Sequence, residues 1–242
     1  MSGKEQFASV WTRPERRRRE QPALSRDQIV TEAIALLDTQ GIDALSMRNL
    51  GARLGVGATS LYTHVANKDE LMELVVDRVY GEIADPDTGQ PGEWRAPARK
   101  LAGEMRAAIL RHPWMSSVFG TGMVQLGPNV LRLSDAVIGL YADAGMSPAA
   151  ANIAVNTITG YVMGVTSIEA GWLLAIARAG DNEQEWVNRL AEAAVEATAP
   201  YPRLRALYTE YADGDAPSSR EQAFWDGLDC ILDGIAVRLL GK

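Results

Sequence analysis

The chain has 242 residues, 47% of them hydrophobic, which suits one small domain and one larger domain, each with an apolar core. The single cysteine, Cys230, excludes an intrachain disulfide framework, and two histidines with one cysteine are too few for an ordinary zinc site, so we expect no metal. We find no run of about eighteen apolar residues and no secretory signal, and therefore expect a cytoplasmic protein with no membrane partner.

Charge is distributed unevenly along the chain, whose net charge is −7. Residues 1–68 carry ten basic and seven acidic side chains, a net charge of +3, whereas residues 69–242 carry 14 basic and 24 acidic ones, a net charge of −10. The acidic excess therefore does not exclude binding of a polyanion by the first part. Residues 13–22, RPERRRREQP, concentrate the positive charge, and we interpret residues 1–23 as a flexible Arg-rich arm. A solvated tail without any partner is the alternative interpretation.

The first predicted helix precedes residue 41. Apolar residues recur at the i, i+3, i+4, i+7 spacing from Val30 to Leu37, which is typical of an amphipathic helix. Ser25 with Gln28 can cap its start, and Gly41 can end it.

Residues 46–70, SMRNLGARLGVGATSLYTHVANKDE, predict two short helices joined by a glycine turn and followed by the start of a third. Ser46 can cap the first helix, and Gly55 can take the left-handed conformation that ends it. The second helix is expected over about residues 58–64. An ordinary helical corner has the same spacing, but such a corner is also how a chain presents one helix to a DNA groove.

The second of these helices turns small or hydrogen-bonding side chains outward, because Leu61 and Val65 lie four residues apart and are expected in the core. Hydroxyl and methyl groups suit base edges, whereas Tyr, His and Lys can hold phosphate oxygens. The outward set is Ala58, Thr59, Ser60, Tyr62, Thr63 and His64. Asn67 with Glu70 then resembles a capping box that opens a connecting helix over about residues 68–84.

The remainder of the chain reads as helices after a Pro- and Gly-rich loop, ADPDTGQPGE. Ser218 with Glu221 forms another apparent capping box, which opens the final helix. We find no alternating strand pattern and no Gly-rich phosphate loop, so we predict an all-α fold and no cofactor. The expected helices are 94–111, 114–119, 128–144, 148–178, 185–197, 201–212 and a last one to about residue 240.

The segment LSRDQIVTEAIALLDTQGIDALSMRNLGARLGVGATSLYTHVANKDELM closely resembles the DNA-binding domain of the tetracycline repressor (TetR) family. Its most specific parts are A-x-x-L-L with Gly41, S-x-R-x-L-x-x-x-L-G-V, and L-Y-x-H-V-x-N-K. The match covers about residues 24–80, and beyond it the likeness is one of helix layout. The resemblance implies a helix-turn-helix domain over 24–70, the connecting helix, and a ligand-binding and dimerisation domain over 85–242.

DNA contacts are implied by the same resemblance. Four residues are expected to meet bases, namely Arg48, Thr59, Ser60 and Thr63, and four to hold phosphates, namely Ser46, Tyr62, His64 and Lys68. Many family members carry a longer polar side chain where this chain has Ala58, so part of the specificity must come from elsewhere. We hypothesise that Arg16, Arg17, Arg18 and Arg19 of the arm enter a neighbouring minor groove.

Two long apolar helices near the C-terminus need a partner surface. They can pack within one chain, but the resemblance implies a two-fold four-helix interface between two copies, which would present two reading helices to a palindromic operator. One short helix reads too few base pairs for useful specificity, which supports a homodimer independently. The candidate interface residues are Gly160, Gly164, Trp225, Leu228, Ile231, Leu232 and Ile235.

A pocket for a small-molecule effector is also implied. Aromatic and Met side chains near sparse polar groups are candidates for its lining, although ordinary core packing is the alternative for each. These candidates are Trp114, Phe119, Met123, Tyr141, Asn152, Asn156, Thr159 and Met163. Tetracycline-specific members of the family hold a magnesium ion with a histidine. The nearest counterpart of that region here is residues 117–121, which contain no histidine. His112 precedes a proline at a predicted helix end and is interpreted as a structural corner.

The favoured function is a dimeric, sequence-specific DNA-binding repressor that a small amphipathic ligand releases from its operator. The alternative is a helical enzyme or small-molecule carrier whose helix-turn-helix is degenerate and does not bind DNA. We find no cofactor loop and no Cys/His dyad at suggestive spacing, and therefore expect no enzyme. Activation instead of repression remains an open alternative.

Overall fold

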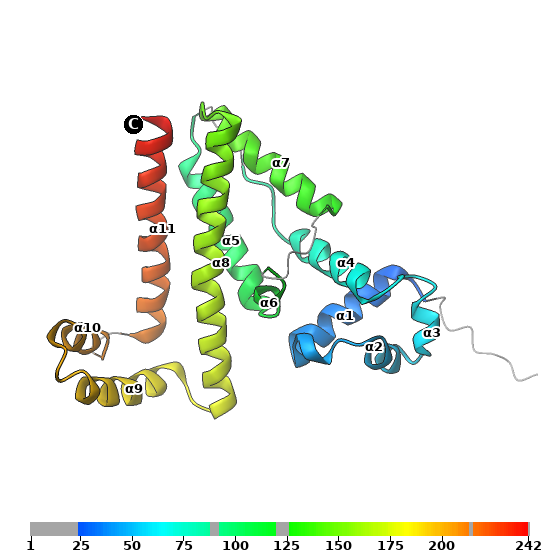
Figure 1. Ribbon diagram of the computed structural model, residues 1–242, viewed down its shortest axis with the longest axis horizontal. Coiled ribbons are helices and arrows are strands. Elements are labelled where there is room, and N and C mark those ends of the chain that lie inside the picture. Colours follow the sequence, from blue (N-terminus) through cyan, green and yellow to red (C-terminus); the bar gives the residue numbers. More distant parts are fainter. Residues whose placement is uncertain (1–23, 88–91, 120–125, 213–214, 242) are drawn as a thin grey trace, which may run out of the picture.

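The computed structural model describes residues 24–87, 92–119, 126–212 and 215–241, and all regular elements in these ranges are helical (Figure 1). The predicted all-α fold is therefore confirmed. The elements are α1 (Arg26–Gln40), the single-turn η2 (Ile42–Ala44), α2 (Met47–Leu54), α3 (Ala58–Leu61), α4 (Lys68–Tyr80), α5 (Arg95–Arg111), α6 (Met115–Phe119), α7 (Pro128–Asp143), α8 (Pro148–Ala179), α9 (Glu183–Ala197), α10 (Pro202–Ala212) and α11 (Ala216–Leu240).

The first four helices pack around one apolar core at one end of the molecule (Figure 1). Ile29 of α1, Leu50 of α2, Leu61 of α3 and Leu71 of α4 are all completely buried. The predicted capping box of α1 is present, because Ser25 Oγ accepts from the N–H of Gln28 and Gln28 Oε1 accepts from the N–H of Ser25. Helix α1 contacts both α2 and α4, and α3 contacts α2, so these four helices form a single packed unit.

Helix α8 is the centre of the larger part of the molecule, with α5, α7 and α11 packed along it (Figure 1). One end of α8 leads into α9 and α10, which lie across the ends of α8 and α11. A buried ion-pair group ties these helices together: Glu169 of α8 accepts from Arg106 of α5 at 2.8 and 2.6 Å and from Arg220 of α11. Arg220 also binds Glu183 of α9 at 2.8 Å.

By length and composition α8 alone among the described helices could cross a membrane, which is weak evidence, because a core helix passes the same test. Only 28% of its most apolar stretch is buried within the single chain. The buried and doubly paired Glu169 fits a helix of a packed bundle, since an ionised group in hydrocarbon is costly. The rest of that stretch is therefore an apolar face that the described part of the single chain leaves uncovered.

Three predicted boundaries were wrong. The final helix begins at Ala216, because the carboxylate of Asp215 accepts the N–H of Ser218 at 3.0 Å and caps the helix in place of the predicted Ser218–Glu221 box. The connecting helix α4 ends at Tyr80, four residues before the predicted end. The reading helix α3 is a single turn, Ala58–Leu61, and is continued by turns through His64.

Candidate DNA-reading surface and effector cavity

The turn between α2 and α3 depends on glycine at two positions. Gly55 ends α2 with φ 68°, in the left-handed region, as predicted. Gly51, inside α2, allows the closest approach, because a Cβ there would lie 2.9 Å from the carbonyl oxygen of Val56. The N–H of Val56 donates to the carbonyl of Gly51 at 2.9 Å, so the chain folds back directly onto α2. The role of Gly51 was not predicted, although a glycine inside a helix is itself a signal of close approach.

The reading helix α3 is anchored to the core on one side and exposed to solvent on the other. Leu61 and Val65 are buried, whereas Thr59, Ser60, Tyr62 and Thr63 are exposed. Two members of the predicted outward set differ, because Ala58 and His64 are half-buried. Arg26 at the start of α1 donates to the carbonyl of His64 at 3.1 Å and thereby fixes the end of the reading segment.

Hydrogen bonds within the reading surface leave particular groups free for a ligand. Thr63 donates its hydroxyl proton to the carbonyl of Ser60 at 2.7 Å, so its oxygen remains an acceptor. Ser46 caps α2 as predicted, by accepting the N–H of Asn49 at 3.1 Å, and its O–H remains a donor. Arg48 and Lys68 are exposed at the first turns of α2 and α4. The arm with Arg16, Arg17, Arg18 and Arg19 lies outside the described residues.

The start of α4 shows a modified capping box. The side-chain oxygen of Asn67 accepts the N–H of Glu70 at 2.8 Å, as predicted. The carboxylate of Glu70 accepts the N–H of Ala66 at 2.6 Å, one residue before the expected partner. The two bonds fix the loop that joins the reading helix to α4.

A cavity of about 200 Å³ lies between α4, α5, α7 and α8. Its wall is mostly apolar, with Ser134, Asn156, Thr159 and two tyrosines as its polar members. Burial raises the pKa of Tyr80 to about 12 and raises the pKa of Tyr141 as well. Both phenols are therefore neutral near pH 7, and each hydroxyl can donate a hydrogen bond. The lining consists of Tyr80, Ala98, Leu101, Ala102, Met105, Val130, Leu133, Ser134, Val137, Tyr141, Val155, Asn156, Ile158 and Thr159.

Three of the eight predicted effector residues line this cavity: Tyr141, Asn156 and Thr159. Two others are placed elsewhere, because Asn152 is exposed outside the lining and Met163 packs against the core. Met123 and the side chain of Phe119 lie outside the described residues, and Trp114 belongs to the domain junction described next. Four lining residues of α4 and α5 were missed, since only folding brings them to α7 and α8: Tyr80, Ala98, Leu101 and Ala102.

His112 and Trp114 connect the larger part of the molecule to α1. The indole N–H of Trp114 donates to the carboxylate of Asp38 at 2.7 Å, and Nδ1 of His112 lies 2.8 Å from the same oxygen. Nε2 of His112 lies 3.3 Å from both carboxylate oxygens of Glu82. His112 is 3% exposed, so the predicted structural corner is a buried junction between α1 and the loop after α5.

A second cavity of about 280 Å³ lies between α8, α9, α10 and α11. Its wall includes Trp172, Leu190 and Tyr208. The charged groups at its edge, Glu183 and Arg220, already bind each other at 2.8 and 3.1 Å. This cavity has no lining residue from α4, whereas the first cavity includes Tyr80. The first cavity is therefore the better candidate for an effector that acts on α4.

The predicted dimer residues fall into three groups. Leu228, Leu232 and Ile235 are buried inside the single chain, which argues against a role for these three in contacting a partner. Ile231 is half-buried and packs against the same core. Trp225 packs on Gly103, with the guanidinium of Arg99 4.1 Å from its ring centroid. The open face consists of Gly160 and Gly164 with Ile153, Ile168 and Gly171 on α8, and of Cys230, Gly234 and Val237 on α11. A periodic apolar helix does not reveal which neighbour buries it.

Known proteins match the chain along nearly its whole length. The family model described as bacterial regulatory proteins, tetR family, matches residues 29–75, and the tetracyclin repressor-like C-terminal domain matches residues 85–239. An HTH-type transcriptional regulator of Saccharopolyspora erythraea is 37% identical over 229 residues, which cover 94% of this chain and 91% of that protein. The HTH-type transcriptional repressor DrrR1 of Streptomyces coeruleorubidus is 32% identical, covering 89% and 78%. The solved structure of the TetR family protein ActR from Streptomyces coelicolor, in complex with actinorhodin, is similar with a TM-score of 0.75 and 27% identity, covering 90% of this chain and 98% of that one.

Proposed function

Because the chain belongs to the tetracycline repressor family of bacterial transcriptional regulators, we propose that it acts as a homodimeric, ligand-released repressor of a palindromic operator. One observation carries this proposal. Tyr80 of α4 lines the effector cavity, and the same helix packs its buried face against α1 of the reading domain. A ligand in the cavity therefore contacts the helix that holds α1, α2 and α3, which together form the reading head.

The reading surface has two kinds of DNA contact in this proposal. Bases are met by Arg48, Thr59, Ser60 and Thr63, and phosphates are held by Ser46, Tyr62, His64 and Lys68. The free acceptor of Thr63 and the free donor of Ser46 support this division, since base amino groups donate and phosphates accept. Ala58 offers only a methyl group, so Arg16, Arg17, Arg18 and Arg19 of the arm are assigned to the flanking minor groove.

The dimer forms through the open faces of α8 and α11. Support comes from the uncovered apolar surface of α8 and from Val237, which is 62% exposed on α11. Gly160, Gly164 and Gly171 lie on this face and allow two helices to approach closely. Two reading heads then bind successive half-sites about one helical turn apart, or a multiple of it.

The effector is a small amphipathic molecule, mostly apolar with a few hydrogen-bonding groups. The apolar wall of the cavity, its neutral tyrosine hydroxyls and the uncommitted Asn156 and Thr159 support this class. In this scheme residues 24–70 form the reading domain, residues 85–242 form the effector and dimerisation domain, and the protein works in the cytoplasm.

An electrophoretic mobility shift on the DNA that flanks the coding sequence tests the proposal. We expect one specific complex on a palindrome and a solution mass of two chains at micromolar concentration. A monomeric mass, or no specific complex with or without residues 1–20, would overturn it and favour the helical carrier or enzyme. A thermal-shift screen of amphipathic natural products, read with and without operator, then identifies the effector class.

A further inference from the structure

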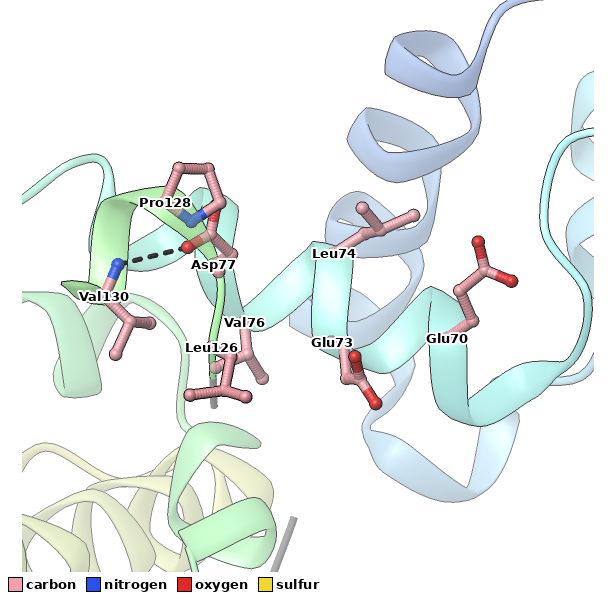
Figure 2. A pocket seen from close by; sticks show the side chains of 9 residues that line it. Glu70, Glu73, Leu74, Val76, Asp77, Leu126, Pro128 and Val130 are labelled. Atoms are coloured by element: carbon pink, nitrogen blue, oxygen red, sulfur yellow. Dashed lines mark hydrogen bonds between the residues drawn. The ribbon is translucent and has the colours of Figure 1, made fainter. Parts of the chain in front are cut away.

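Helix α4 supplies the N-terminal cap of α7. Asp77 Oδ1 accepts the N–H of Asn129 at 2.9 Å and the N–H of Val130 at 3.1 Å. Asp77 Oδ2 accepts from the side-chain amide of Asn129 at 2.9 Å. Figure 2 shows the Asp77 carboxylate turned from α4 toward the first turn of α7. A carboxylate at this position satisfies backbone donors that the helix itself cannot satisfy and lies at the positive end of its dipole.

The residue at the ordinary cap position of α7 is Gly127, which has no side chain to donate or accept. A Cβ on Gly127 would overlap the Asp77 carboxylate, so glycine is required for the two helices to approach this closely. Pro128 follows as the first helical residue and has no N–H to satisfy. The first turn of α7 is therefore built to receive a cap from another helix.

Val130 connects this contact to the effector cavity. Its N–H is held by Asp77, while the residue lines both the effector cavity and a groove of about 270 Å³ between α4 and α7. Further along α7, Leu133, Val137 and Tyr141 belong to the cavity wall. A shift of α7 caused by a bound molecule thus acts directly on the carboxylate of Asp77.

The other junction between the two parts of the molecule differs in this respect. Asp38, His112 and Trp114 line none of the three cavities described above. Of the two junctions, the one at Asp77 alone includes a residue of the effector cavity wall. Asp77 therefore joins a wall residue of the cavity, Val130, to the helix that holds the reading head.

We propose that Asp77 is the positioning residue that couples the effector cavity to the reading head. By capping α7 it holds α4 in the orientation that binds the operator, and a ligand that displaces the first turn of α7 releases α4. This inference rests on the proposed ligand-released repressor and names the contact through which that release passes.

Three substitutions test the coupling without a known ligand. Asp77→Asn weakens the charged acceptor, Gly127→Ala pushes the same contact apart, and Glu73→Gln is the matched control. Glu73 lies on α4, four residues before Asp77 and in the same groove, but it is exposed. We expect the first two substitutions each to weaken operator binding by at least about fivefold, the lower end of typical coupling. The control should change it by less than about twofold, as an exposed charge does.

The two active substitutions break one contact, so the double variant should bind the operator about as weakly as either single variant. Fully multiplicative effects would contradict a shared contact. Operator affinity is measured by fluorescence anisotropy, with far-ultraviolet circular dichroism and thermal melting to establish that each variant is folded.

Hydrogen exchange separates coupling from a merely structural cap. Because coupling is reciprocal, operator binding should slow exchange at the amides of Asn129 and Val130 in the natural chain and not in Asp77→Asn. Equal protection in both proteins, or unchanged operator affinity in Asp77→Asn and Gly127→Ala, overturns the proposal. If the natural chain itself binds no operator, the proposed function fails instead, so the two failures are distinguishable.

Discussion

Replacing Glu169 with Gln tests the ion-pair group that joins α5, α8 and α11. The side chain of Glu169 is 3% exposed and that of Arg106 is 12% exposed, so both are largely removed from water. Removing one partner of a buried ion pair costs about 3–5 kcal/mol, because the remaining charge is left unpaired. Here the amide oxygen of Gln can still accept one hydrogen bond, and Arg220 keeps Glu183 as a partner. We therefore expect the lower end, a loss of about 3 kcal/mol in the free energy of unfolding.

Urea unfolding at fixed chain concentration, followed by circular dichroism, measures this loss, and calorimetry should show a fall in Tm of about 6–12 °C for a chain of this size. The matched control is Asp233→Asn, which breaks a pair with Arg95 at 2.5 Å whose carboxylate side is 69% exposed. An exposed pair contributes less than about 1 kcal/mol. If Glu169→Gln costs no more than Asp233→Asn, the buried group does not stabilise the bundle and the reasoning is refuted.

Three further predictions concern the reading head and the effector cavity. Gly51→Val should abolish specific operator binding and lower the Tm, because a side chain there collides with the carbonyl of Val56; a fully active variant in a gel shift would contradict the close approach. Deleting residues 1–20 should weaken operator binding and flatten the slope of log affinity against log salt, and an unchanged slope would exclude arm contacts. Tyr80 has a pKa raised by burial from 10.0 to about 12, so the unfolded chain ionises first as the pH rises. The stability that Tyr80 contributes is therefore complete below pH 10 and lost as the pH rises toward 12, which urea titrations of the natural chain and Tyr80→Phe at several pH values can detect as a difference confined to that window.

Local signals predicted the reading head well. Ser25 and Ser46 cap their helices as their positions before apolar periods indicated, and Gly55 takes the left-handed conformation. These features depend on residues three or four apart, so a short stretch of sequence contains the whole interaction. The close match to the family over the same stretch rests on the same local pattern.

Long-range partners could not be predicted in the same way. Trp114 was assigned to the effector pocket because it is a large aromatic residue, yet its indole N–H binds Asp38, 76 residues earlier. Leu228 and Leu232 were assigned to the dimer because they are apolar and periodic, yet the core of the same chain buries them. Periodicity indicates that a face is buried and does not identify the surface that buries it. Asp77 carried no sequence signal at all, because its partners lie more than fifty residues away.

The single turn of α3 has a consequence for how operator preference can change. Leu61 and Val65 anchor the reading segment, and Arg26 holds its end, whereas the exposed Thr59, Ser60, Tyr62 and Thr63 contribute little to the packed core. Surface substitutions of this kind usually change stability by no more than about 0.5 kcal/mol. Under the proposed assignment of Thr59, Ser60 and Thr63 to bases, evolution or a combinatorial library can therefore vary these three positions and acquire a new operator while the packed scaffold stays intact.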